Sequence, residues 1–130
     1  MMRRAVAAMA ILLLLTACGG GSPPVTGIAA TGEELFSRTV LGDNPGCTTC
    51  HSLKPGTVLV GPSLATIGID ASTREASISA RDYLLESITA PDAFVVEGFD
   101  PGRMPPDWSD QLAPDEIDAI VEYLITLGAG

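Results

Sequence analysis

The chain has 130 residues with three Cys, one His and four Met, and its 7 basic and 16 acidic residues give a formal net charge of −9. This length fits one domain with a leader and excludes two full domains. Three cysteines cannot form a complete disulfide framework, and one histidine cannot supply a site that needs two imidazoles. The acidity makes nucleic acid a poor partner, because phosphate binding needs clustered Lys and Arg.

The N-terminus has the three parts of a secretory signal. Two Arg residues precede an apolar run from Ala5 to Leu15, and Thr16-Ala17-Cys18 follows. The run is too short to remain in a bilayer as a spanning helix. The ending Leu15-Thr16-Ala17-Cys18 resembles the bacterial lipobox, in which the Cys is diacylated and becomes the new N-terminus. We expect residues 1–17 to be a lipoprotein signal peptide and Cys18 a lipid anchor. The alternative is an ordinary signal peptide with a coincidental Cys.

Cleavage before Cys18 would change the composition that matters for function. Five basic residues would remain against sixteen acidic ones, a charge of 5 − 16 = −11, and Met104 would be the only methionine left. Gly, Ser and Pro after Cys18 predict a flexible linker over 18–30, followed by a folded domain over 31–130. This organisation predicts an exported protein, lipid-anchored at the periplasmic or other extracytoplasmic face of a bacterial membrane.

Three segments of the domain have the pattern of amphipathic helices. The first is predicted over 32–41 from the capping-box spacing of Thr31 and Glu34. The second is predicted to start after Ser79 and to stop before Pro91, and the third to run from Pro114 until Gly128. Their buried stripes would be Leu35, Phe36, Val40 and Leu41, then Tyr83, Leu84 and Ile88, and finally Ile117, Ile120, Val121, Leu124 and Leu127.

The rest of the domain has little periodic pattern. Residues 52–78 are interrupted by Gly and Pro, and residues 90–113 read as loop. No convincing strand or internal repeat appears. We therefore expect a small, mostly α-helical domain with long loops, which buries little area unless something fills its centre.

The stretch Cys47-Thr48-Thr49-Cys50-His51 carries the most chemical information. Cysteines three apart on a helical turn face the same way and can add to the two vinyl groups of one haem, while the adjacent His offers its imidazole to the iron. Two alternatives compete with covalent haem. A thioredoxin-like redox pair would sit in a βαβ unit, which is not visible, and a zinc site would need a carboxylate as fourth ligand.

Met104 is the candidate for the sixth position of a haem iron. The chain has no second His, and Met104 stands in the sequence Gly102-Arg103-Met104-Pro105-Pro106. A lone Met in a proline-stiffened loop is an unusual core filler, whereas a thioether is a common haem ligand. The alternative is a partly exposed loop Met beside an open or water-bound iron.

These elements resemble those of class I monohaem cytochromes c, in the family's order across residues 31 to 128. The matching features are a helix with Gly32 and Phe36, Cys47 to His51, Gly61-Pro62-Ser63-Leu64, a middle helix, the Met104-Pro105 loop and a last helix with Tyr123. The resemblance implies an all-α, small cytochrome c fold, with three main helices plus short helical turns and long loops around one covalent haem c.

The resemblance also implies two structural roles. The Pro62 carbonyl would accept a hydrogen bond from Nδ1–H of His51 and orient the ring; the alternative is that Pro62 only stiffens its loop. Gly32 would allow the first and last helices to cross closely. We interpret Tyr83, Phe99 and Trp108 as packing residues rather than site residues; the alternative is that they line the haem or hydrogen-bond its propionates.

The predicted function is that of a membrane-tethered carrier of single electrons between a donor and an acceptor redox protein. The stretch from Tyr83 to Phe99 is similar to cytochromes that serve respiratory oxidases and quinol-oxidising complexes. With His51 and Met104 on the iron, no position is open for substrate, so we expect no enzyme activity. The alternatives are a non-dissociating subunit of such a complex, and a peroxidase or gas-binding haem protein, which would need open iron.

The charge of the predicted mature chain departs from mitochondrial cytochromes c, which ring the haem edge with lysines. Lys54 is the only Lys here. A partner guided by electrostatics would therefore present positive charge. The alternative is that the acidity only solvates the surface of an exported protein.

Overall fold

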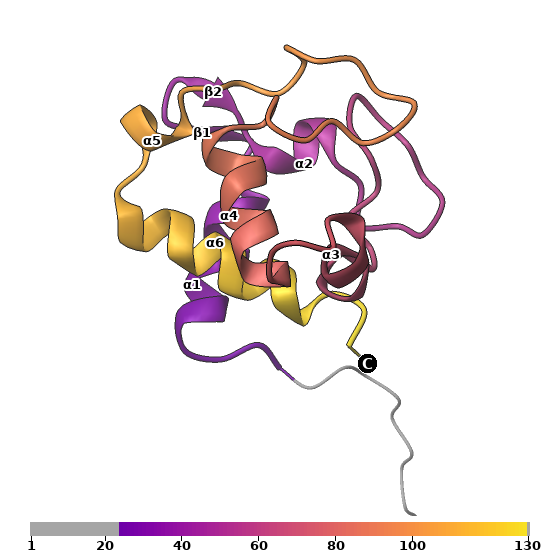
Figure 1. Cartoon of the computed structure of the whole chain (residues 1–130). Helices are drawn as coiled ribbons and strands as arrows, with labels where there is room; N and C mark the ends of the chain where they lie inside the picture. Colours follow the sequence, from indigo (N-terminus) through magenta and orange to yellow (C-terminus); the bar gives the residue numbers. More distant parts are fainter. Residues whose placement is uncertain (1–23, 130) are drawn as a thin grey trace, which may run out of the picture.

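The computed structural model describes residues 24–129, so the predicted signal peptide, Cys18 and linker residues up to 23 lie outside the described residues. The described chain forms six helices and one small hairpin (Figure 1). In chain order these are α1 (Ile28–Ser37), β1 (Val40–Leu41), β2 (Asn44–Pro45), α2 (Cys47–Cys50), α3 (Ile67–Arg74), α4 (Ala80–Thr89), α5 (Trp108–Gln111) and α6 (Pro114–Thr126). The prediction of an all-α domain with long loops is confirmed. No helix within residues 24–129 is long and apolar enough to cross a membrane.

The packing of α1 on α6 is the most extensive contact between any two elements. A Cβ at Gly32 would overlap the Ala119 carbonyl and would lie 2.9 Å from Cβ of Tyr123, so the crossing needs a residue without a side chain. Phe36 and Tyr123 stack beside it, with ring centroids 5.5 Å apart. The close crossing implied by the resemblance is therefore present.

Gly32→Val is expected to lower the free energy of unfolding by about 3 kcal/mol, because the added methyl groups force the two helices apart. The measurement is urea unfolding followed by circular dichroism. Thr31→Val adds the same side chain at the neighbouring exposed position and should change stability by less than about 0.5 kcal/mol. Equal effects of the two substitutions would contradict the role of Gly32.

Helices α4 and α6 begin as their sequences predict. The Ser79 hydroxyl caps α4 by accepting from the Asp82 backbone N–H at 3.1 Å, and the Glu116 carboxylate accepts from the Ala113 N–H at 2.9 Å. The predicted stripes of both helices are buried, except that Leu127 is only half-buried. Arg81 ties the two helices together, at 3.1 Å from Asp118 and 3.2 Å from Glu122.

The predicted bounds of the first helix are wrong at both ends. Helix α1 starts at Ile28, after Gly27 with φ 63°, so residues 28–30 are helical rather than linker and Thr31 is not a cap. The good helix formers Ala29 and Ala30 extend the helix upstream of the expected start. It ends at Ser37, and Val40, predicted to be buried, is 63% exposed in the hairpin of β1 and β2.

Two helices lie in segments without a predicted helix, α3 and α5. In α3 the buried positions Ile67 and Ala71 are four apart, but Ile69 is exposed and obscures the apolar stripe. Gly68, which resembles a helix breaker, instead lets α3 approach the end of α6, where its N–H donates to the Leu127 carbonyl at 3.1 Å. Close packing between distant segments, rather than local propensity, explains this glycine.

Candidate functional site

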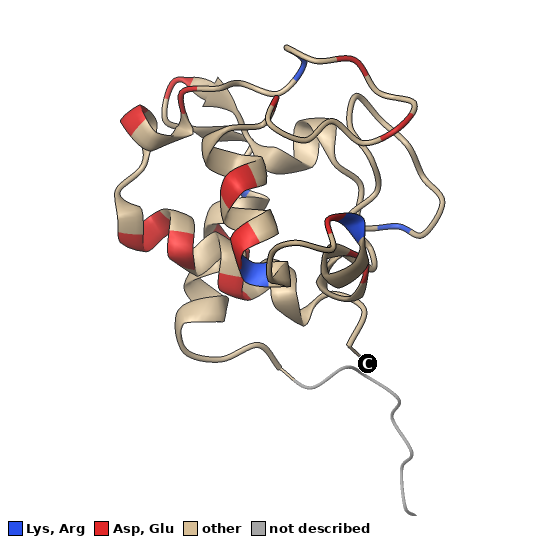
Figure 2. Cartoon of the chain, viewed as in Figure 1, with Lys and Arg blue, Asp and Glu red and all other residues tan. Residues whose placement is uncertain are grey.

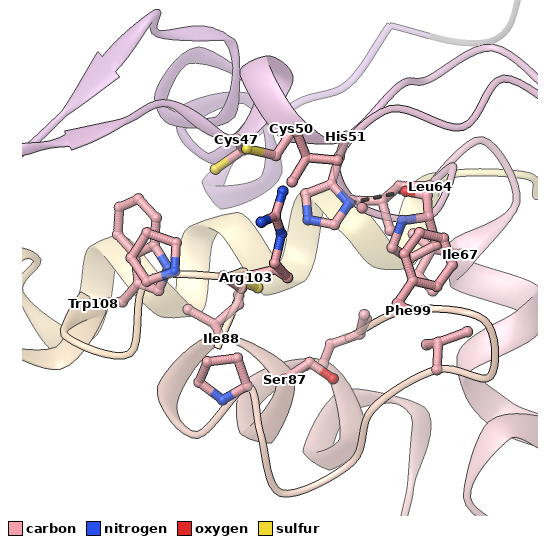
Figure 3. A pocket seen from close by; sticks show the side chains of 18 of the residues that line it. Cys47, Cys50, His51, Leu64, Ile67, Ser87, Ile88, Phe99, Arg103 and Trp108 are labelled. Carbon is pink, nitrogen blue, oxygen red and sulfur yellow. Dashed lines mark hydrogen bonds between the residues drawn. The ribbon is translucent and has the colours of Figure 1, made fainter. Parts of the chain in front are cut away.

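A single apolar pocket lies at the centre of the described domain, and each of its six helices contributes at least one lining side chain. The walls include Phe36 from α1, Ile67 from α3, Leu84 and Ile88 from α4, Trp108 from α5, and Ile120 and Leu124 from α6. Cys47, Cys50, His51, Pro62 and Met104 line the same pocket. The structure thus brings together all the predicted haem-site residues, from segments up to 57 positions apart in the chain (Figure 3).

The two cysteines are presented by α2, a single helical turn. The turn begins after Gly46, whose backbone packs on the Arg38 carbonyl too closely for a Cβ, and closes with a bond of 2.9 Å from the His51 N–H to the Cys47 carbonyl. Figure 3 shows both sulfur atoms on the same side of this turn, facing the pocket. Burial raises the pKa of the Cys47 thiol to about 11.

The imidazole of His51 is held by the backbone of the loop that follows α2. Its Nδ1 lies 2.9 Å from the Pro62 carbonyl, to which Nδ1–H donates, as the dashed line in Figure 3 marks. A Cβ on Gly61 would lie 2.5 Å from Cε1 of the ring, so the loop backbone rests directly against the imidazole. Burial lowers the pKa of His51, although the bond to Pro62 opposes this, which favours the neutral ring with Nε2 free to coordinate.

Met104 reaches the pocket from the long loop between α4 and α5. The side chain is half-buried and packs against the hydrophobic core. The loop is shaped by Gly102, with φ 71°, whose N–H donates to the Asp92 carboxylate at 2.8 Å. Pro105 follows and restricts the backbone after the thioether.

The two other interpretations of Cys-x-x-Cys find no support. Within residues 24–129 no group of three or more His, Cys, Asp or Glu side chains is placed to hold a metal ion. The same residues contain no βαβ unit, and a reactive thioredoxin-like Cys needs a lowered pKa, whereas that of Cys47 is raised.

Several residues that the sequence analysis did not assign to the site also line the pocket: Arg74, Tyr83, Phe99, Arg103 and Trp108. Three of them are the aromatic residues interpreted as simple packing. Trp108 is only 4% exposed, and its indole N–H has no hydrogen-bond partner among the described residues. Its lone occurrence just after the Met104 loop was a usable signal. No local signal marks Arg74, because it ends a helix that the sequence does not reveal.

The pocket fits a large apolar group that carries a metal ion and also has hydrogen-bond acceptors. Its walls are apolar, two thiols can attach to vinyl groups, an imidazole and a thioether can ligate an iron, and Trp108 offers a buried donor. That donor set matches haem c.

Comparison with known proteins assigns the chain to a family. Residues 29–128 match the Cytochrome c family, so the chain belongs to it. No curated protein gives a significant match. As a cytochrome c, the chain carries covalently attached haem c and transfers electrons through it.

Proposed function

We propose that the protein is a membrane-tethered carrier that moves single electrons between respiratory redox partners, with the haem bound through Cys47 and Cys50 and the iron ligated by His51 and Met104. The observation that carries this proposal is the convergence of these four residues, from two segments far apart in the chain, on one apolar pocket. When bound, haem c supplies an iron that alternates between the ferric and ferrous states.

The residues of the chain hold this centre in a fixed geometry. Pro62 accepts from Nδ1–H of His51 and thereby sets the ring orientation, leaving Nε2 for the iron. The Met104 thioether, which lines the same pocket, would serve as the second protein ligand of the iron, favour its ferrous form and raise the reduction potential. With His51 and Met104 both on the iron, haem bound here would offer no open position to a substrate, so the protein on its own would not act as an enzyme.

The apolar walls limit the energy needed for each electron transfer. With haem bound, these apolar walls would leave little room for water, so fewer dipoles would have to reorient when the charge of the site changes. Helices α1 and α6, locked at Gly32, hold one side of these walls rigid.

The tether belongs to the part of the chain before residue 24. The basic start, the apolar run and the lipobox-like ending at Cys18 support export and diacylation, and Gly, Ser and Pro support a flexible linker up to α1. The folded domain would then work at the extracytoplasmic face of a bacterial membrane while free to reorient.

Cys18→Ser is expected to release the protein into the soluble exported fraction without loss of haem. Cell fractionation and mass spectrometry of the N-terminal peptide test this. The unaltered protein should carry acyl chains on Cys18 and remain with the membranes. An unmodified N-terminus, or retention of the variant on membranes, would contradict the anchor.

The electron-carrier proposal is tested by mixing the purified, pre-reduced protein with membranes of the source organism and following the haem absorbance. Rapid reoxidation that stops with inhibitors of the terminal oxidase is expected. Purification in mild detergent separates a carrier from a fixed subunit. A carrier should elute alone, whereas stoichiometric co-elution with an oxidase or quinol-oxidising complex would favour the subunit alternative.

A further inference from the structure

An exposed apolar surface lies beside the pocket, on the loop between α2 and α3. Val58, Leu59 and Val60 are consecutive and are 62%, 48% and 42% exposed. Across a shallow groove from them lie Phe99 and Asp100 of the loop before Met104. Single exposed apolar residues are ordinary, but three in a row facing an aromatic residue indicate an interaction surface.

The loop that displays these residues is fastened to the haem-attachment turn. The Gly61 N–H donates to the Cys50 carbonyl at 2.9 Å, the Leu64 N–H to the Ser52 carbonyl at 2.9 Å, and the Ser63 hydroxyl to the Lys54 carbonyl at 2.9 Å. The backbone is therefore held in place on both sides of the apolar residues. A surface that is already ordered loses little conformational entropy when a partner binds.

The surface also lies in a stretch of an acidic chain that has no acidic residue. None of the sixteen acidic residues falls between positions 44 and 69. Among Asp, Glu, Lys and Arg, this stretch contains only Lys54. Figure 2 shows the loop between α2 and α3 almost free of colour, while acidic positions follow α4 and α6. Asp100 and Arg103 both line the groove and Glu97 lies beside it, so the edge of the surface carries two acidic residues and one basic residue.

A short path through the backbone and one hydrogen bond joins this surface to His51. Val60 lines both the groove and the central pocket, and the next two residues are Gly61, which rests on the imidazole, and Pro62, which accepts from it. A partner seated on Val58 to Val60 would therefore lie three residues and one hydrogen bond away from the ring.

We infer that Val58, Leu59, Val60 and Phe99 form the docking surface for an electron-transfer protein whose own cofactor lies under an apolar patch bordered by Lys and Arg. The inference rests on the proposed function. The apolar residues would supply the dry centre of a small, transient interface, and the acidic chain would attract the basic border from a distance.

Val58→Glu tests the surface, and Val40→Glu is its matched control, because Val40 is equally exposed, at 63%, but lies on the distant hairpin. Both variants add the same charge to the same residue type. With membranes of the source organism as acceptor, reoxidation of pre-reduced Val58→Glu should be slower by roughly tenfold, because an unpaired charge is forced into the interface. Val40→Glu should match the unaltered protein within about twofold. Equal rates for the two variants would overturn the inference.

A second probe does not depend on the natural partner. On gold coated with a methyl-terminated thiol monolayer, the unaltered protein and Val40→Glu should exchange electrons readily, and Val58→Glu should lose most of the signal. If membranes fail to reoxidise any variant while the electrode still separates them, the respiratory role fails but the docking surface stands. Equal electrode responses would refute the surface while leaving the carrier function intact.

The salt dependence of reoxidation and a test of binding to lipid vesicles show what kind of partner binds the docking surface. Raising ionic strength should slow reoxidation of the unaltered protein, because it screens the attraction to a basic partner; a rate that rises with salt would overturn the proposed border charge. Phosphatidylcholine vesicles should not bind the Cys18→Ser protein. Vesicle binding that Val58→Glu abolishes and Val40→Glu retains would show that the surface contacts lipid instead.

Discussion

The double variant Cys47→Ser/Cys50→Ser is expected to be largely unfolded at room temperature. Every helix of the described domain contributes at least one side chain to the pocket, so loss of the haem would leave these pocket-lining side chains facing an empty cavity. An unfilled apolar cavity of this kind lowers stability by several kcal/mol, against a total of roughly 5–15 kcal/mol for an ordinary domain. Small domains have the smallest free energy of unfolding to lose, because they bury the smallest share of their surface.

Far-UV circular dichroism and urea unfolding of the exported protein measure this loss. Cys18→Ser is the matched control, since it makes the same substitution at the remaining Cys and should keep both the haem and the helical signal. A double variant with the helical signal of the unaltered protein and a cooperative urea transition would contradict the view that haem forms part of the core.

Replacement of Met104 is expected to change the iron rather than the fold. Met104→Leu keeps an apolar side chain of similar volume but removes the thioether. The reduction potential should fall by on the order of 0.1 V, within the roughly 0.8 V over which axial ligands set haem potentials. The ferrous protein should also bind carbon monoxide, which the unaltered protein should not.

Met104→Ala should give the same spectroscopic result with an additional loss of stability, because it also leaves space beside the core residues that Met104 contacts. Comparing the two variants separates ligation from packing. An unchanged ligand spectrum and potential in Met104→Leu would show that another group, or none, occupies the sixth position.

Local signals predict the elements whose ends are set by their own residues. Ser79 with Asp82, and Pro114 with Glu116, mark helix starts that the structure contains, because capping depends on atoms within one turn. The bounds of α1 were mistaken because Thr31 and Glu34 have the spacing of a capping box inside a helix that Ala29 and Ala30 had already begun. Helix α3 could not be predicted, since Gly68 is explained only by its contact with α6.

The residues of the candidate site likewise fall into those that the sequence indicates and those that it does not. Cys47, Cys50 and His51 lie within five consecutive positions, and Met104 could be singled out because the predicted signal cleavage would leave no other methionine. The contact of His51 with Pro62 followed from family resemblance, and the structure contains it at 2.9 Å. The wall at Arg74 belongs to α3, which the sequence does not reveal, so no single stretch of sequence indicates this residue.

The most direct test of the central claim, a haem centre with both axial positions filled that moves one electron at a time, is a spectroelectrochemical titration of the purified exported protein. The account predicts a single reversible wave that fits one electron per protein, with six-coordinate, low-spin spectra in both the ferric and the ferrous form. A high-spin spectrum in either form, or a protein without a reversible one-electron wave, would contradict it.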